Sequence, residues 1–494
     1  MSDLLWSSTH PSAPLRWRLW CLAFGFMAVN FFLLVRGQLN LLCALLIFSQ
    51  LAILSVLNKH LAILVAFAYL LLLGDIRRVF GSIMGWPTLD LLLLVGPILT
   101  IFLVLPLLLR LRLSDPLSKC ILALMVLMTL EIFNPKQGGI AVGVSGAMFY
   151  LVPLMWFWIG RQYATDELVS KLLYRVIFPL GMLATILGIY QTYFGFLPWE
   201  QAWIDYNIIH LHSIHMGNGF YRPFGYSVNG LEYGDLLIVT CSLTLGAFFS
   251  KKRLYGLLLP LPFIAIVLSA MRSPIVKLLV AAAVGWALSR QRGRGWLFRF
   301  ILGVCILGTL LMIALNRFGG GDQNAQSASD AALQHQTEGL SHPLDPKHST
   351  AGLHAQMFGS GILRGILYPI GYGLGSTTLG SGKFGGNEDA AGSSEVDISD
   401  IFTTLGVLGG VLYFYICIII LQIAFNYARN KPKSISLPVI VILFGMAGNW
   451  MALGQYAITP FIWLLVGAMV RAKNEDDLSK RQTAHLQTAH PLTV

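Results

Sequence analysis

"FYRPFGYSVNGLEYGDLLIVTCSLTLGAFFS", residues Phe220 to Ser250, changes character halfway along. Its first half holds an arginine, a proline, glycines and two carboxylates, and its second half belongs to an apolar run centred on residues 233 to 250. The hydrocarbon core of a bilayer, about 30 Å thick, needs roughly 20 apolar residues for each crossing helix. The stretch therefore predicts a membrane-spanning helix with charged residues gathered at one end.

The composition of the whole chain indicates the same environment. Of its 494 residues, 56% are hydrophobic and only 12% are charged, and the mean hydropathy is +0.69. A water-soluble core of this length needs far less apolar surface. The sequence therefore predicts an all-α polytopic integral membrane protein.

About 14 apolar runs have a length suited to membrane crossing. They centre near residues 18–35, 38–57, 61–74, 90–109, 119–133, 142–160, 171–195, 233–250, 254–271, 273–289, 296–316, 399–426, 437–454 and 456–470. The run at 61–74 is short, which predicts a re-entrant or tilted piece there.

Two other function classes are disfavoured by the composition. The six cysteines all lie in apolar runs and form no CxxC pair, so redox chemistry is not expected. A net charge of +11 is found in many nucleic-acid-binding proteins, but here the basic residues form short clusters between apolar runs, where anionic lipid and topology explain them. We therefore expect the bilayer, and no nucleic acid, as a partner.

The basic residues also predict the orientation of the chain. With both termini in the cytoplasm, 23 of the 34 lysines and arginines fall on the cytoplasmic side and 11 outside, although the outer loops are longer. Cytoplasmic loops of membrane proteins carry this excess of positive charge. The predicted layout is 1–195 N-terminal membrane helices, 196–232 first long outer loop, 233–316 central membrane helices, 317–398 large outer loop, 399–471 C-terminal membrane helices and 472–494 cytoplasmic tail.

The large outer loop divides into two parts. Its beginning, "GGGDQNAQSASDAALQHQTEGLSHPLDPKHST" (319–350), is polar and of low complexity, which predicts flexibility. The next residues, "AGLHAQMFGSGILRGILYPIGYGLG" (351–375), have helical spacing followed by a proline and glycines. This predicts a helix at the membrane interface that ends in a tight turn.

Ionisable residues gather at the outer ends of the expected spans. Charges near hydrocarbon are costly and usually pair with one another or line a polar cavity. Because these residues share one leaflet, we expect a cationic cavity edged by carboxylates; its members are Glu131, Arg222, Glu232, Asp235, Arg272, Lys277, Glu395, Asp397 and Asp400. Alternatives remain open: Arg272 as an interfacial anchor, Arg222 as a brace of its own loop, and Lys277 as a partner of Asp235 or Glu131.

The histidines give a weaker signal. His210, His212 and His215 are poorly spaced for one helix face and lack a nearby acidic ligand, so no metal site is expected. His335 and the other histidines of the large loop give no separate indication of a metal. His354 differs from them because it lies where that loop becomes ordered.

Four segments resemble one known family. "YRPFGYSVNGLEYGDLL" resembles the R-P-x-G-x-x-x-x-x-N-x-x-A segment of the bacterial O-antigen ligase and polymerase superfamily, and "VLSAMRSPIVKLL" resembles its S-x-S-R-x-x-x-x-x-L helix junction. "ILYPIGYGLGSTTLG" is similar to its H-P-x-x-G-x-G-x-G, and "SSEVDISDIFTTLGVLGGVLYFY" to its H-N-x-x-L-x-x-x-x-x-x-G-x-x-G-x-x-x-F. The resemblance spans residues 180 to 425.

The resemblance implies a periplasmic-side glycosyltransferase of the integral-membrane GT-C type in the bacterial inner membrane. The implied donor is a polyprenyl-diphosphate-linked glycan, and neither a metal nor another cofactor is implied. A polymerase passes the glycan to another lipid-linked repeat unit, and a ligase passes it to a lipid A core. A chain-length regulator and other polysaccharide assembly proteins are candidate partners. A lipid-linked sugar transporter or flippase is the alternative from another class.

The resemblance also assigns roles to residues. Arg222 and Arg272 are expected to stabilise the diphosphate leaving group, because fixed guanidinium forks match phosphate oxygens. Glu395 stands where the ligase pattern has its histidine, which favours the polymerase branch, and a glutamate can still serve as general base. Glu395 pairing with Arg272 or Arg364 remains the alternative. The expected substrate-binding residues are Asn229, Glu232, Asp235, Lys277, His354, Arg364 and Asp397.

The orientation can be tested with reporter fusions. A reporter fused at Gly320 should be exposed outside the cytoplasm, and one fused at Lys433 should be cytoplasmic, because basic residues favour the cytoplasmic side. Paired reporters active on only one side of the membrane give the readout. Equal signals from the two positions would contradict the predicted topology.

Overall fold

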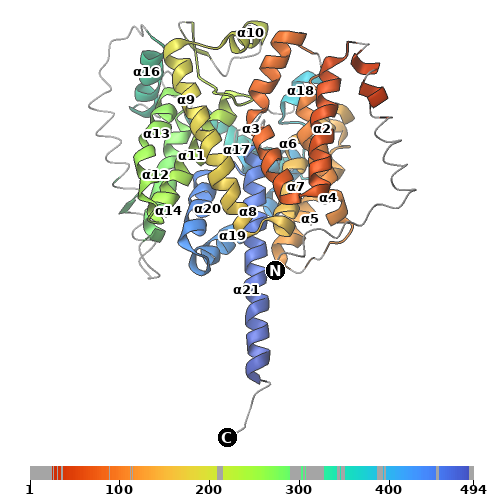
Figure 1. The fold of residues 1–494 in the computed structure, drawn as a ribbon, viewed down its shortest axis with the longest axis vertical. Helices are drawn as coiled ribbons and strands as arrows, with labels where there is room; N and C mark the ends of the chain where they lie inside the picture. Colours follow the sequence, from red (N-terminus) through yellow and green to blue (C-terminus); the bar gives the residue numbers. More distant parts are fainter. Residues whose placement is uncertain are drawn as a thin grey trace, which may run out of the picture.

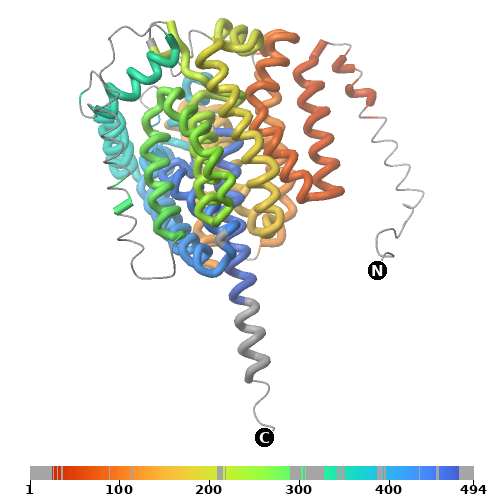
Figure 2. The backbone as a smooth tube through the Cα atoms, turned by 60° about the vertical axis from the view of Figure 1, so that its left-hand side comes forward, coloured from red at the N-terminus to blue at the C-terminus, as the bar shows by residue number. Residues whose placement is uncertain are grey.

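The computed structural model describes residues 37–87, 89–111, 115–207, 215–217, 219–289, 327–341, 351–385, 396–451 and 455–488, with a few isolated positions between them. Long helices run side by side through one bundle (Figure 2). Helices α10 (Pro198–Asn207) and α16 (Ala328–Ser341) lie at one end, and α21 (Ile458–Thr488) extends from the other (Figure 1). We call these the α10 end and the α21 end.

Six helical stretches of the described residues are long and apolar enough to cross a membrane. They are α2 (Leu39–Leu57), α3 (Lys59–Met84), Ile140–Tyr163 made of α6 (Ile140–Phe149) and α7 (Leu151–Tyr163), Asp166–Phe194 made of α8 (Asp166–Lys171), the π-helical η2 (Leu172–Ile177) and α9 (Phe178–Phe194), α11 (Gly230–Phe249) and α19 (Asp397–Asn430). The expected all-α membrane protein is thus confirmed. The number of about 14 spans and the orientation stay predictions.

Shorter elements complete the bundle. The shorter apolar helices are α4 (Leu92–Leu108), α12 (Arg253–Leu258) with α13 (Pro260–Leu268), α14 (Ser273–Ser289) and α20 (Lys433–Gly445). The others are α5 (Pro116–Glu131), the 3-10 turn η1 (Pro135–Gln137), α17 (Ala351–Leu367) and α18 (Leu379–Lys383). A small antiparallel hairpin pairs β1 (His215–Gly217) with β2 (Phe220–Tyr221).

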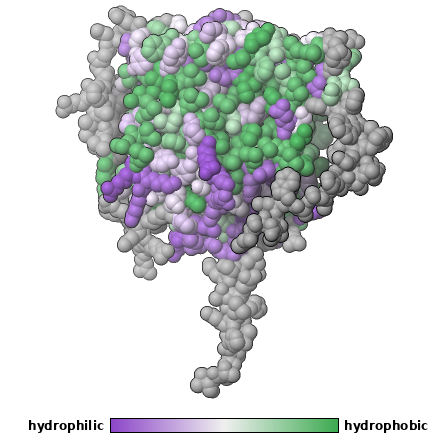
Figure 3. Space-filling view, viewed as in Figure 1, coloured by the Kyte–Doolittle hydropathy of each residue, from purple (hydrophilic) through white to green (hydrophobic). Residues whose placement is uncertain are grey.

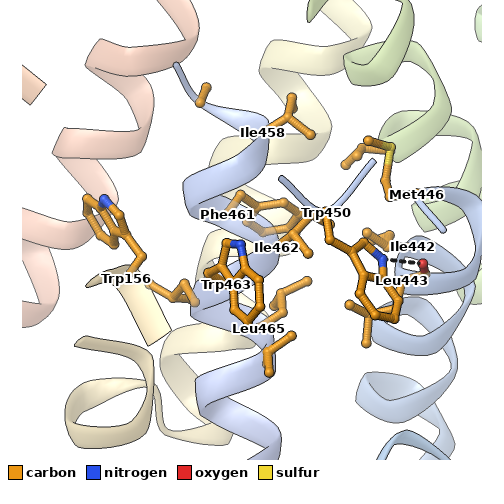
Figure 4. Close-up of a cluster of buried hydrophobic side chains, with 14 of the residues drawn as sticks. Trp156, Ile442, Leu443, Met446, Trp450, Ile458, Phe461, Ile462, Trp463 and Leu465 are labelled. Carbon is orange, nitrogen blue, oxygen red and sulfur yellow. Dashed lines mark hydrogen bonds between the residues drawn. The ribbon is translucent and has the colours of Figure 1, made fainter. Parts of the chain in front are cut away.

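The core of the bundle is apolar and aromatic. Around α7, α20 and α21, Trp156, Phe461 and Trp463 are almost completely buried (Figure 4). The indole nitrogen of Trp450 donates a hydrogen bond of 3.0 Å to the Leu443 carbonyl, which satisfies a polar atom that has no access to water. Aromatic burial therefore holds the C-terminal helices to the centre.

The outer surface of the bundle is also hydrophobic. Hydrophobic residues cover much of the face in Figure 3, and hydrophilic residues gather on its lower part. On α9 the side chains of Leu183 and Ile186 are half exposed. An exposed apolar band of this kind suits contact with lipid rather than water.

A non-helical segment, residues 369–378, is inserted against α19. The backbone N–H groups of Tyr372 and Gly373 donate to the carbonyls of Thr403 and Thr404 at 3.0 and 3.1 Å. Regular helical bonds to those carbonyls are interrupted at Gly406, whose φ of 68° lies in the left-handed region. The inserted segment therefore supplies the hydrogen bonds that a kinked helix in a membrane would otherwise lack.

Three expectations from the sequence are wrong in part. The run at 61–74 is no short piece, because α3 continues to Met84 with its charges paired inside the protein. The stretch at 319–350 contains the ordered helix α16. The run at 437–454 overestimates α20, which ends at Gly445. Most residues of the runs at 296–316 and 18–35 lie outside the described residues.

Candidate functional site

Two arginines predicted for one site meet at a third residue, at the α10 end of the bundle. Arg222 follows β2, Arg272 lies in the turn between α13 and α14, and His335 lies on α16. The His335 Nε2 atom is 3.4 Å from the Arg222 Nη2 atom and 3.2 Å from the Arg272 Nη2 atom. All three side chains are half-buried. We call these three residues the arginine cluster.

The cluster keeps two positive charges at neutral pH. Guanidinium groups carry donors and no acceptor, so Nε2 of His335 accepts from both arginines and the ring proton lies on Nδ1. Burial, followed by the charges of Arg272 and Arg222, lowers the pKa of His335 to about 4. Burial also lowers the pKa of Arg272, but an arginine remains protonated in proteins. The imidazole is therefore neutral and the two guanidiniums are charged.

Helix α16 is docked onto the turn that holds Arg272. The Gln336 side-chain amide donates to the Met271 carbonyl at 2.9 Å. The His335 carbonyl accepts from Nε and Nη2 of Arg272 at 3.3 and 3.0 Å. One turn further along, a Cβ atom on Gly339 would lie 1.8 Å from Cζ of Arg272. Any side chain at position 339 would therefore displace the Arg272 guanidinium from the place it occupies.

The side-chain amide of Gln191 holds the backbone of the segment that carries Arg222. Oε1 of Gln191, on α9, accepts from the backbone N–H groups of Phe224 and Gly225 at 3.0 and 2.8 Å. Its Nε2 donates to the Gly225 carbonyl at 3.0 Å and to Glu200 at 2.8 Å. Burial raises the pKa of Glu200, on α10, to about 7. Both donors and both acceptor positions of the Gln191 amide are thus used on this scaffold, which fixes the backbone beside Arg222.

A buried arginine supports the same segment from α3. Arg78 is 1% exposed, and its guanidinium carbon lies 4.7 and 4.2 Å from the ring centroids of Trp203 and Phe224. Its Nη2 donates to the Ser227 carbonyl at 2.5 Å, and its Nη1 donates to Asp75 at 3.1 Å. Aromatic faces and a carboxylate therefore compensate its charge.

Sequence reasoning missed Arg78, Gln191, Glu200 and the role of His335. A signal existed for Arg78, because it stands in "GDIRRVFG" directly after the apolar run at 61–74. The predicted run ends at residue 74, before these charges. Gln191 and His335 have no local pattern that marks them, since their partners are distant in the chain.

Most of the expected substrate-binding residues on α11 and α14 have partners inside the protein. Asn229 caps α11 by accepting from the Glu232 N–H at 2.8 Å. Glu232 accepts from the Ala457 N–H at 2.8 Å. Asp235 accepts from Lys277 at 3.0 Å and from Gln455. The pairing of Lys277 with Asp235, one of the open alternatives, is therefore confirmed, and these groups link α11 to α14 and α21.

The residues expected near α17 and α19 lie in different surroundings. Asp397 is buried and accepts from the Tyr413 hydroxyl at 3.0 Å and from the Met451 N–H at 2.9 Å. His354 and Arg364 are half-exposed on α17, which packs along α19. Glu395 lies outside the described residues, so its role as a base stays a prediction.

The cluster has the chemistry of an anion site. Two guanidinium forks converge in a half-buried position, where charge-assisted hydrogen bonds to phosphate oxygens are stronger than those between neutral groups. No family model matches this chain, and no curated protein matches it either. The cluster therefore has to be interpreted from its own geometry.

Replacing Arg78 should destabilise the protein strongly. In Arg78→Leu the carboxylate of Asp75 and the Ser227 carbonyl lose a buried donor, and breaking a buried pair costs about 3 to 5 kcal/mol. Thermal unfolding of the purified protein in detergent measures this. Lys171→Ala, which removes an exposed pair with Glu167, is the control and should leave the unfolding temperature nearly unchanged. Equal losses in the two variants would contradict a supporting role for Arg78.

Removing either arginine of the cluster should weaken anion binding. Hydrogen bonds to charged groups contribute about 1.5 to 3 kcal/mol, so Arg222→Ala and Arg272→Ala should each raise the Kd for inorganic pyrophosphate roughly tenfold to a hundredfold. Lysine in place of either arginine should not restore binding, because it lacks the planar fork. Calorimetric titration of the full chain measures this, with Arg253→Ala at the other end of α11 as the control. Unchanged affinity in either alanine variant would exclude that arginine.

Proposed function

We propose that this protein is a metal-independent glycosyltransferase that polymerises polyprenyl-diphosphate-linked oligosaccharide repeat units. The observation that carries the proposal is the convergence of Arg222 and Arg272 on one point at the α10 end. The two arginines come from two of the four segments that resemble the O-antigen ligase and polymerase superfamily. Their common position supports a shared role for these segments.

The arginine cluster suits the departure of a diphosphate. In the reaction an acceptor hydroxyl attacks the anomeric carbon of the donor glycan, the bond from that carbon to the diphosphate oxygen breaks, and the hydroxyl proton passes to a base. Negative charge grows on the leaving oxygen as the bond breaks. Two fixed guanidiniums stabilise that charge more than they stabilise the intact donor, which lowers the barrier.

The acceptor side of the reaction has its candidate base in Glu395, two residues before α19 begins at Asp397. A general base of this kind contributes a factor of about 100 to 10,000 to the rate. The glutamate replaces the histidine of the ligase pattern, which favours polymerisation over transfer to lipid A core. The expected location is the inner membrane of a bacterium, with the cluster on the periplasmic side.

Deletion of the gene tests this function through glycan length. A strain without a polymerase should carry single repeat units on the lipid carrier or on the final acceptor, because later units cannot be added. A strain without a ligase should instead accumulate long chains on the carrier. Electrophoresis of extracted glycans and lipid-linked intermediates distinguishes them, and long lipid-linked polymer would contradict the polymerase assignment.

Complementation of that strain tests the site. The wild-type chain should restore long glycan, whereas Arg222→Ala and Arg272→Ala should reduce extension by a factor of roughly 100 to 1,000, as expected when one transition-state donor is lost. Immunoblotting of membranes checks that protein levels match, and Arg253→Ala should behave as wild type. If a transporter were the correct class, the deletion would leave repeat units on the cytoplasmic face of the membrane.

A further inference from the structure

The donor site proposed above is not built from the two arginines alone, because a histidine of α16 lies between them. We propose that His335 is a positioning residue whose ring nitrogen couples Arg222 to Arg272, so that both guanidiniums face one diphosphate. This inference rests on the proposed function and extends it to a helix with no counterpart among the segments that resemble the family.

His335 holds the two arginines by different atoms. Its backbone carbonyl accepts from Nε and Nη2 of Arg272, whereas its ring Nε2 lies within hydrogen-bond distance of both Arg272 and Arg222. A substitution at position 335 leaves the carbonyl in place. Arg272 should therefore remain anchored to α16 while Arg222 loses its link to the pair.

A neutral acceptor is the appropriate group between two cations that must bind an anion. A carboxylate at this position would form ion pairs with the arginines and compete with phosphate for them, and a lysine would repel them. The imidazole instead accepts hydrogen bonds without cancelling charge, and burial together with the two arginines keeps its pKa near 4, well below neutral pH. The nearby carboxylate of Glu338 raises the pKa of Arg272 and so partly balances its burial.

The surroundings of His335 show that its position is fixed. Gln336 is 2% exposed and donates to the carbonyls of Met271 and Val267 at 2.9 and 3.3 Å. Gly339 follows His335 by four residues, on the same helix face, and leaves the space in which the Arg272 guanidinium lies. The residues at 335, 336 and 339 thus form one contact surface on α16 for the turn that carries Arg272.

Two substitutions distinguish the role of His335 as a hydrogen-bond acceptor from a role in packing alone. His335→Leu removes the ring nitrogen but fills the space, and His335→Gln restores an acceptor atom at a similar distance from the backbone. Titration of the full-length protein with inorganic pyrophosphate should show a Kd at least roughly tenfold higher for the leucine variant, since an aligned hydrogen bond to a charged group is worth about that factor. The glutamine variant should remain within a few-fold of wild type.

Thr337→Ala is the matched control on the same helix, because the Thr337 hydroxyl bonds only to carbonyls of α16. It should bind pyrophosphate as wild type does, and thermal unfolding should show all three variants folded. In a glycan-extension assay with purified protein, His335→Leu should lower kcat as well as raise the donor KM, because misaligned arginines stabilise the leaving diphosphate less in the transition state. His335→Gln should keep both values within a few-fold of wild type.

The outcomes distinguish the inference from the proposed function. Wild-type affinity in His335→Leu, or equal loss in the leucine and glutamine variants, would overturn the positioning role and leave the proposed function intact. If the wild type extends glycans, and substitutions at position 335 leave its Kd for pyrophosphate unchanged, the positioning role is likewise overturned and the proposed function stands. A wild-type protein that neither binds pyrophosphate nor extends glycans would overturn the proposed function, and the inference with it.

Discussion

The charge of Arg78 is the constraint on which the α10 end of the bundle depends. Its guanidinium is almost fully buried, and an uncompensated charge in such a place would cost several kcal/mol. The chain compensates it with Asp75, with two aromatic faces and with the Ser227 carbonyl. Because Phe224 and Ser227 flank the turn at Gly225, satisfying Arg78 also fixes the backbone that presents Arg222.

The α10 end of the bundle also brings the positive charges of Arg222 and Arg272 together, and the surrounding structure has to hold them there against their repulsion. Both guanidiniums have a nitrogen within 3.4 Å of the same His335 nitrogen, so two like charges repel each other across a short distance. The Gln191 amide holds the Arg222 segment, and α16 holds Arg272, so the rigid scaffold bears this repulsion. An arriving anion relieves it. A preorganised cationic pair therefore binds a diphosphate without the cost of assembling the site.

The sequence predicts the membrane class and marks the two arginines that the fold brings together, because both depend on local features. The length of an apolar run indicates whether it can cross a bilayer as a helix. The arginine beside a proline and a glycine marks the turn at residues 222–225. The sequence-based prediction fails where a partner far away in the chain decides whether a segment is helical. The predicted apolar run ends at residue 74, yet α3 continues through Asp75 and Arg78, and Ser227, far away in the chain, accepts from Arg78. Helix α16 was missed for the same reason: its polar composition predicts flexibility, but Gln336 docks on carbonyls about 65 residues away.

The docking of α16 has a thermodynamic consequence for the site. Few apolar side chains fix this helix, and polar bonds from Gln336 and His335 provide much of its attachment. If the aligned cluster exists only while α16 is docked, the apparent Kd for an anion equals the intrinsic Kd divided by the docked fraction. Because Arg272 contacts both α16 and the ligand in the proposed site, an anion that binds the aligned arginines must also favour the docked helix. Anion affinity and the ordering of α16 are thus two aspects of one equilibrium.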